Sequence, residues 1–181
     1  AGDLLFVLGH SHGGLVATLW GLSRGRHVAG FVLSSPYFEL AFPPPPLKLA
    51  AAKLVGLVAP WLPMPAGLDL ADLTSDVELQ RWTDRDPLYG RKTTPRWFEE
   101  SRRAQAEALR RAGEFTAPLL VLTGTEDHIA RPGATRRFVE AAGSSDKKLV
   151  VYDGFRHELF NEVRREAPIG ETVAWLDSHA R

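Results

Sequence analysis

The sequence predicts an α/β protein in which helices flank a parallel β-sheet. Short apolar runs alternate along the chain with segments whose apolar residues recur at helical spacing. Residues 9–14 (GHSHGG) directly follow one such run and directly precede a helical pattern. This alternation is typical of a parallel sheet, because each connection between parallel strands crosses over through a covering helix.

The N-terminal part contains two expected strands and one helix. Residues 4–8 (LLFVL) form a continuous apolar run, as expected for a strand that is covered on both faces. Leu15, Leu19 and Leu22 then recur at helical spacing, which predicts a helix. Residues 28–33 (VAGFVL) form a second apolar run and are expected to be the next strand.

A stretch of different composition, residues 39–113, follows the second strand. It includes four consecutive prolines at 43–46, which favour a stiff, extended spacer. An apolar helix is expected at 47–62, followed by a turn rich in Pro and Gly and a charged helix at 96–111. Long ordered insertions in compact domains tend to be lids or binding loops, so we expect a cap over a pocket, with an ordinary surface insertion as the alternative.

The last part of the chain returns to the α/β pattern. Strands are expected at 118–122 (PLLVL) and 149–152 (LVVY), with helices at 132–142 and 169–178. The predicted division is therefore a core formed by residues 1–38 and 114–181, interrupted by a cap insertion at residues 39–113.

The composition describes one globular domain without a strong electrostatic field. Of 181 residues, 44% are hydrophobic, and Lys plus Arg equals Asp plus Glu at 22 each. This balance does not favour nucleic acid, so a small neutral substrate is expected. The absence of Cys excludes disulfides and a cysteine nucleophile, and the cytoplasm is the default location. The apolar residues 47–62 are fewer than the roughly 20 that a membrane span needs.

Ser11 lies in a G-x-S-x-G pattern at a strand-to-helix turn. Such a turn strains the serine backbone, and we expect any side chain at Gly9 or Gly13 to clash with neighbouring chain. The turn exposes the Ser11 hydroxyl and directs the backbone N–H of His12 toward an oxyanion that forms on attack. The pattern in this context predicts a nucleophilic serine.

A serine nucleophile requires a histidine base and a carboxylate that orients the base. His157 lies on a loop after the last strand, where the chain order serine, acid, histidine places it. Asp127 follows a buried strand, at a position from which it could hold the imidazole. Glu126, Glu39 and Asp153 are alternative acids.

The remaining histidines raise a different possibility. His10 and His12 form an H-x-H pair, which is common in metallohydrolase sites, but the residues that follow supply no further ligands. No metal and no other cofactor are therefore expected. His27 and His179 are expected to be surface or structural residues, and His128 adjoins the predicted acid.

Several segments in order resemble the α/β-hydrolases and, within them, the monoacylglycerol lipase and lysophospholipase group. GHSHGG resembles the nucleophile turn of this group, which usually has methionine where this chain has His12. Residues 73–90 (LTSDVELQRWTDRDPLYG) resemble its cap, residues 118–132 (PLLVLTGTEDHIARP) its acid loop and residues 150–162 (VVYDGFRHELFNE) its histidine loop.

The resemblance implies the α/β-hydrolase fold with a helical cap and specific roles for four residues. Ser11 would be the nucleophile, Asp127 the acid, His157 the base, and the backbone N–H of His12 an oxyanion donor. The implied activity is hydrolysis of acylglycerol or lysophospholipid esters through an acyl-enzyme, without a cofactor and with transient membrane-surface contact through the cap. The alternatives are a noncatalytic binding protein with a hydrolase shape and a hydrolase of peptide or carbon–carbon bonds.

The same resemblance predicts that further sequence precedes this chain. Members of the group carry about four strands, and the loop with the second oxyanion donor, before the nucleophile turn. We therefore expect a C-terminal portion of a longer hydrolase that lacks about a hundred residues, with an unpaired apolar strand at the sheet edge. Such a portion alone is expected to be a weak or inactive enzyme.

Overall fold

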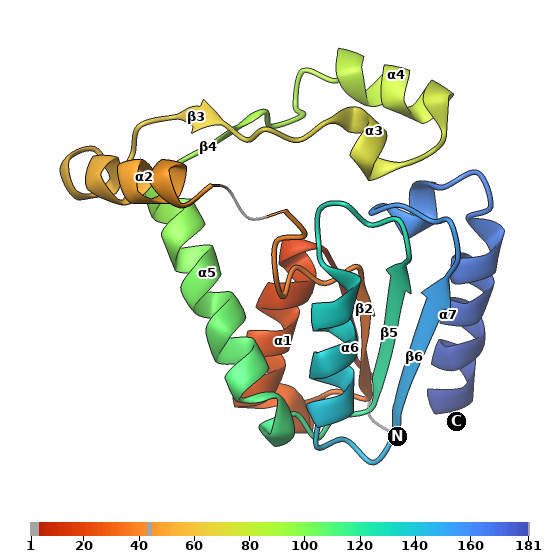
Figure 1. Cartoon of the computed structure of the whole chain (residues 1–181). Coiled ribbons are helices and arrows are strands. Elements are labelled where there is room, and N and C mark those ends of the chain that lie inside the picture. Colours follow the sequence, from red (N-terminus) through yellow and green to blue (C-terminus); the bar gives the residue numbers. More distant parts are fainter. Residues whose placement is uncertain (1–3, 43–44, 181) are drawn as a thin grey trace.

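The computed structural model describes residues 4–42 and 45–180 and contains a four-stranded parallel sheet (Figure 1). The strands lie in the order β1-β2-β5-β6. Their bounds are Phe6–His10 for β1, Gly30–Ser34 for β2, Leu119–Gly124 for β5 and Lys147–Tyr152 for β6. The predicted α/β class is confirmed, and each of the four expected strands is present.

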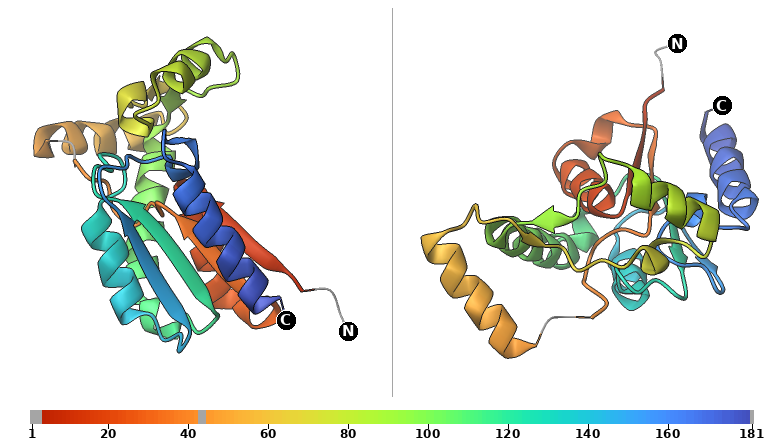
Figure 2. Two further views of the ribbon diagram at one scale, coloured as in Figure 1. Left: turned by 90° about the vertical axis from the view of Figure 1, so that its right-hand side faces the viewer. Right: turned by 90° about the horizontal axis from the view of Figure 1, so that it is seen from above.

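Helices cover both faces of this sheet. Figure 2 shows α7 (Glu166–His179) on one face, while α1 (His12–Arg24), α5 (Pro95–Arg110) and α6 (Pro132–Ala141) lie on the other. Short 3-10 turns occur at Gly25–His27, Ala112–Glu114 and Leu159–Asn161. The final helix begins at Glu166 and not at the expected residue 169. The apolar spacing starts only at Ile169, but the first turn of a helix tolerates a proline such as Pro168.

Alternate side chains of the central strands fill two separate hydrophobic layers. Phe31 and Val121 point into the layer beneath α1, α5 and α6, where Phe38 and Phe138 stack with ring centroids 4.4 Å apart. Leu120 points to the opposite layer, under α7. Burial on both faces explains why β2 and β5 read as continuous apolar runs.

The expectation that residues 4–8 are covered on both faces is wrong. β1 is the edge strand of the described sheet, and Leu8 is 54% exposed. Phe6 and Val7 do pack against the two hydrophobic layers. The apolar edge strand that the resemblance predicted is, however, present in the described sheet, and Leu8 is an exposed apolar side chain on it.

We call residues 39–113 the insertion. The part of it that precedes α5 lies beyond the carboxyl end of the sheet (Figure 1). It contains α2 (Pro46–Val58), β3 (Met64–Pro65), α3 (Leu70–Leu73), α4 (Val77–Arg85) and β4 (Lys92–Thr93), followed by α5. Pro43 and Pro44 of the expected spacer lie outside the described residues, and Pro46 begins α2, where proline is well tolerated. Within the described ranges, no helix combines the length and the apolar character needed to cross a membrane.

Helices α3 and α4 were not expected from the sequence. Each begins after an aspartate whose side chain caps it: Asp69 accepts a hydrogen bond from Ala71 N, and Asp76 accepts from Glu78 N and Leu79 N. These capping residues were the available signal. Both helices are short, and α4 buries no residue, so hydrophobic periodicity could not indicate them.

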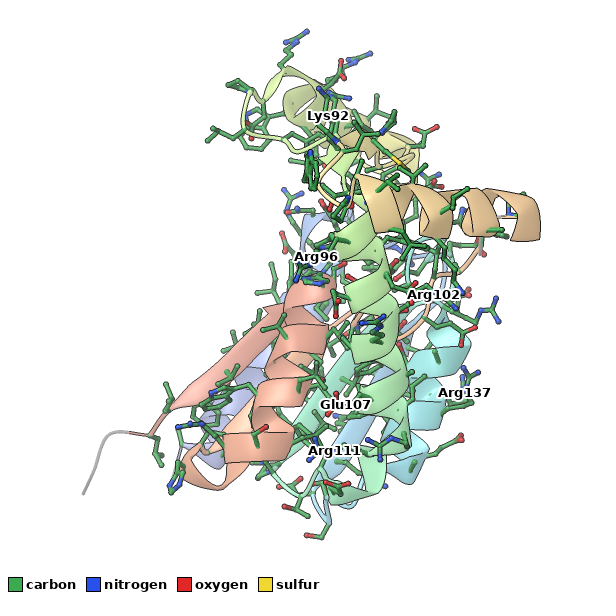
Figure 3. The ribbon with its side chains drawn as sticks, turned by 90° about the vertical axis from the view of Figure 1, so that its left-hand side faces the viewer. Lys92, Arg96, Arg102, Glu107, Arg111 and Arg137 are labelled. Atoms are coloured by element: carbon green, nitrogen blue, oxygen red, sulfur yellow. The ribbon has the colours of Figure 1, made fainter. Side chains whose placement is uncertain are left out.

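Helix α5 joins the insertion to the core. Ala108 on its inner face is fully buried in the layer beneath α1 and α6. Its outer face is charged, as expected for this segment. Figure 3 shows Arg96, Arg102 and Glu107 following one another along the helix, with Arg111 at its end.

Candidate active site

Ser11 lies at the sharp turn between β1 and α1, at the carboxyl end of the sheet. Its backbone has φ 52° and ψ −120°, a conformation that a residue with a side chain rarely adopts. Two hydrogen bonds hold it there: Ser11 N donates to Ser34 O at 2.9 Å, and Ser11 O accepts from Tyr37 N at 3.0 Å. The surrounding backbone therefore maintains the strain that presents the hydroxyl.

The glycines around Ser11 do not contribute equally to this turn. A Cβ at Gly9 would lie 2.6 Å from Gly13 O, so the expected clash holds there. The expectation is wrong for Gly13, where a Cβ would meet nothing within 4 Å. Gly13 faces outward on the first turn of α1. Gly14 is the glycine that lies close to Pro36, since a Cβ added at Gly14 would be 3.0 Å from Pro36 Cβ.

The side chains of Ser11, His157 and Asp127 lie in hydrogen-bonding contact. His157 Nε2 is 2.7 Å from Ser11 Oγ, and His157 Nδ1 is 2.9 Å from Asp127 Oδ2. His157 and Asp127 are each only 3% exposed. With Nδ1 protonated and donating to the carboxylate, Nε2 is free to accept the serine proton.

Asp127 is held by the loop that follows β5. Its Oδ1 accepts hydrogen bonds from Ile129 N at 2.9 Å and from Ala130 N at 2.8 Å. These donors fix the carboxylate plane and satisfy a buried negative charge. Oδ2 faces His157.

The alternative acids have other partners. Glu39 pairs with Arg131 at 2.8 Å and also with Arg137. Glu126 Oε2 lies 3.5 Å from His128 Nε2, and Asp153 accepts a hydrogen bond from Thr125 Oγ1 at 3.1 Å. Their contacts direct them away from the His157 ring. His128 also faces Asp72 of the insertion, at 3.2 Å.

His10 and His12 point to different parts of the site. The His10 ring lies against the His157 ring, with centroids 4.9 Å apart, and His10 Nδ1 is 3.3 Å from Ser34 Oγ. Burial, with the nearby His157 as a smaller cause, lowers the pKa of His10 to about 4. In residues 4–42 and 45–180, no group of three or more His, Asp or Glu side chains is arranged to hold a metal.

The backbone N–H of His12 is the first of helix α1 and has no acceptor within the helix. An oxyanion next to Ser11 would find this donor and the positive end of the helix dipole. The His12 side chain turns toward the insertion: its ring lies 5.1 Å from the Trp97 ring, and its Nε2 is 3.4 Å from Ser101 Oγ.

An open cavity of about 590 Å³ adjoins Ser11. The core lines it with Tyr37 and Ile129 beside Ser11 and His12, and the insertion contributes further walls, including Leu68, Thr93, Trp97 and Phe98. Residues 39–113 were expected to bind substrate as a group, but none of these side chains was expected individually. Aromatic residues at the start of a charged helix were the signal for Trp97 and Phe98.

Comparisons with known proteins find a matching family and similar proteins with names. Residues 1–164 match the Hydrolase_4 family, described as serine aminopeptidase, S33. The monoacylglycerol lipase of Mycolicibacterium smegmatis is 30% identical over 96% of this chain, and the phospholipase YtpA of Bacillus subtilis is 30% identical over 97%. The chain spans 62% and 68% of the lengths of these two relatives.

The fold has a close counterpart among solved structures. The crystal structure of the monoacylglycerol lipase of Paleococcus ferrophilus superposes with a TM-score of 0.91 at 30% identity. The match covers 98% of this chain and 69% of that one. The described sheet, its helices and the insertion therefore share their arrangement with a lipase.

Proposed function

The chain belongs to the Hydrolase_4 family, and we propose that it forms the catalytic part of a serine hydrolase that cleaves carboxylic esters of lipids. In this proposal Ser11 is the nucleophile, His157 the general base and Asp127 the residue that orients the base. The observation that supports this proposal most directly is the 2.7 Å contact between Ser11 Oγ and His157 Nε2, with Asp127 on the other ring nitrogen.

The proposed reaction has two acyl-transfer steps. Ser11 Oγ attacks the ester carbonyl while His157 Nε2 takes its proton, and the backbone N–H of His12 stabilises the tetrahedral oxyanion. His157 then donates this proton to the alcohol oxygen as the ester bond breaks. The alcohol departs, and the acyl group remains bound to Ser11. A water molecule activated by His157 hydrolyses the acyl-enzyme and restores Ser11.

The proposed substrates are monoacylglycerols or lysophospholipids with a medium or long acyl chain. Leu68, Trp97 and Phe98 supply an apolar wall beside Ser11, which suits an acyl chain. The relatives named monoacylglycerol lipase and phospholipase support this class. We also propose that residues 39–113 act as the cap, and that exposed Leu57 and Trp61 contact lipid surfaces transiently.

Labelling with a fluorophosphonate probe, together with hydrolysis of p-nitrophenyl esters from acetate to laurate, tests this proposal. We expect the protein that contains this chain to be labelled and to show a kcat/KM that rises with acyl length. Ser11→Ala should abolish labelling and reduce hydrolysis by about 10³-fold or more.

His157→Gln is the second variant, because it leaves the nucleophile in place and removes the base. Its hydrolysis should fall by a similar factor, since a serine without a base is a poor nucleophile. A folded protein that neither reacts with the probe nor hydrolyses any ester would instead indicate a noncatalytic binding protein.

A further inference from the structure

Glu162 is a buried carboxylate in the segment that follows His157. It is 3% exposed, and its hydrogen-bond partners are neutral groups. Oε1 accepts from Ser75 N at 3.1 Å and from Arg156 N at 2.9 Å, while Oε2 accepts from the Ser75 hydroxyl. A buried carboxylate is tolerated only when such donors replace its hydration, so this site is built to hold one.

The same two segments of the chain meet at several other points. Glu158 N donates to Leu73 O at 2.7 Å, and the Arg156 guanidinium donates to Ala71 O at 2.6 Å. In Figure 1, α3 accordingly lies above the loop between β6 and α7. We call these contacts between residues 71–75 and residues 156–162 the latch. The insertion therefore holds the backbone on both sides of His157.

Glu162 occupies a particular place in the latch, because a single carboxylate binds both segments. It accepts from Ser75 in the insertion and from Arg156, the residue directly before His157. Without it, two backbone N–H groups would lose their acceptor at once. Because an unsatisfied buried donor is costly, the local backbone would rearrange to find other partners.

His157 depends on this backbone because its strand ends well before it. β6 ends at Tyr152, and the loop must then reach across the sheet to bring His157 Nε2 within 2.7 Å of Ser11 Oγ, which follows the opposite edge strand, β1. Asp127 orients the ring but does not hold the backbone. A displacement of about 1 Å between reacting groups can cost about 100-fold in rate.

We propose that Glu162 is a positioning residue that ties His157 to the insertion, so that the reach of the base to Ser11 depends on where residues 71–75 lie. The proposal rests on the proposed function, in which His157 is the base. A movement of this part of the insertion is then transmitted to the base through the latch. Glu162 contacts neither substrate nor any reacting atom.

Glu162→Leu tests this role, because leucine is close to glutamate in size but accepts no hydrogen bond. Glutamine would not test it, since its amide oxygen could replace Oε1, which accepts from both Ser75 N and Arg156 N. We expect kcat to fall by about 10- to 100-fold, with KM unchanged within about threefold, and the rate of fluorophosphonate labelling to fall in parallel. Ser75→Ala removes only the hydroxyl contact and should lower kcat by a smaller factor, about 2- to 5-fold.

Glu166→Leu is the matched control, because Glu166 is exposed at the start of α7 and its substitution should leave kcat unchanged. A folded Glu162→Leu protein whose kcat stays within about twofold of the parent overturns the proposal. A loss of kcat that only follows the unfolded fraction, measured by circular dichroism, overturns it as well. Should Glu162→Leu not fold, Ser75→Ala decides, and an unchanged kcat in that variant overturns the proposal.

A readout that does not need turnover separates this proposal from the proposed function. The proton on His157 Nδ1, hydrogen-bonded to Asp127, can be followed by NMR. Its resonance should shift or broaden in Glu162→Leu and stay unchanged in Glu166→Leu. An inactive, unlabelled parent protein would refute the proposed function, whereas an unmoved resonance would refute the positioning role.

Discussion

The core and the insertion reach stability in different ways although both are rich in apolar residues. In the core, β5 is buried at all six positions, and its leucines pack into two filled layers. In the insertion, Leu57, Trp61 and Leu88 are largely exposed, and α4 buries no residue. The core carries Ser11, Asp127 and His157, and the insertion leaves exposed apolar surface above it.

The largest expected effect contrasts a leucine in each region. Leu120→Ala should lower the free energy of unfolding by about 2–5 kcal/mol, because Leu120 is fully buried and the substitution leaves a cavity. Leu57→Ala should change it by less than about 0.5 kcal/mol, because Leu57 is 80% exposed. Urea denaturation measures both values, and a similar loss in the two variants would show that the insertion is packed as tightly as the core.

The two histidines on either side of Ser11 should differ in how much they make the stability of the protein depend on pH. The folded-state pKa of His10 is about 4, below the unfolded value of 6.5, so the unfolded chain binds more protons between these values. The stability linked to His10 is therefore complete above pH 6.5 and is lost as the pH falls toward 4. His157 and Asp127 also face this ring, lowering and raising its pKa respectively.

His10→Asn should accordingly remove about 2 kcal/mol of the stability loss between pH 7 and pH 5. His12→Asn should remove less, because burial lowers the pKa of His12 too but His12 is less buried than His10. Urea denaturation of both variants and the parent at the two pH values measures this. An equal pH dependence in parent and His10→Asn would contradict the burial of the His10 ring.

The smallest effect concerns two tryptophans of the insertion. Trp97 lines the cavity next to Ser11, whereas Trp82 on α4 is 65% exposed and lies away from that cavity. Trp97→Ala should lower kcat/KM for p-nitrophenyl laurate by about tenfold and for the acetate ester by much less, since only the long chain buries apolar area there. Equal losses for Trp97→Ala and Trp82→Ala would mean that this wall does not bind the acyl chain.

Most of the core and the two long helices of the insertion, α2 and α5, could be predicted from the sequence, whereas α3, α4, β3 and β4 could not. Residues 118–122 and 28–33 read as strands because burial on both faces leaves a continuous apolar pattern. Parallel strands end at one edge of a sheet, so Ser11, Asp127 and His157 could be expected to meet, and the structure brings them together. Their catalytic roles stay predictions.

What escaped prediction depends on contacts between distant segments. The empty space around Gly13 follows from the direction in which α1 leaves the turn. The contact between Ser75 and Glu162 joins residues 87 positions apart. No local pattern around a glutamate indicates that it will be buried by a distant serine.

The position of the insertion along the chain affects how such proteins can change during evolution. The insertion lies between β2 and β5, which are direct neighbours in the sheet, and α5 alone suffices as the crossover helix between them. The preceding elements, α2 to β4, can therefore be lengthened, shortened or exchanged during evolution without changing a strand pairing. Residues 71–75 are an exception, because they contact the backbone on both sides of His157. Exchange of the other elements from α2 to β4 would alter the cavity walls beside Ser11 without altering these contacts.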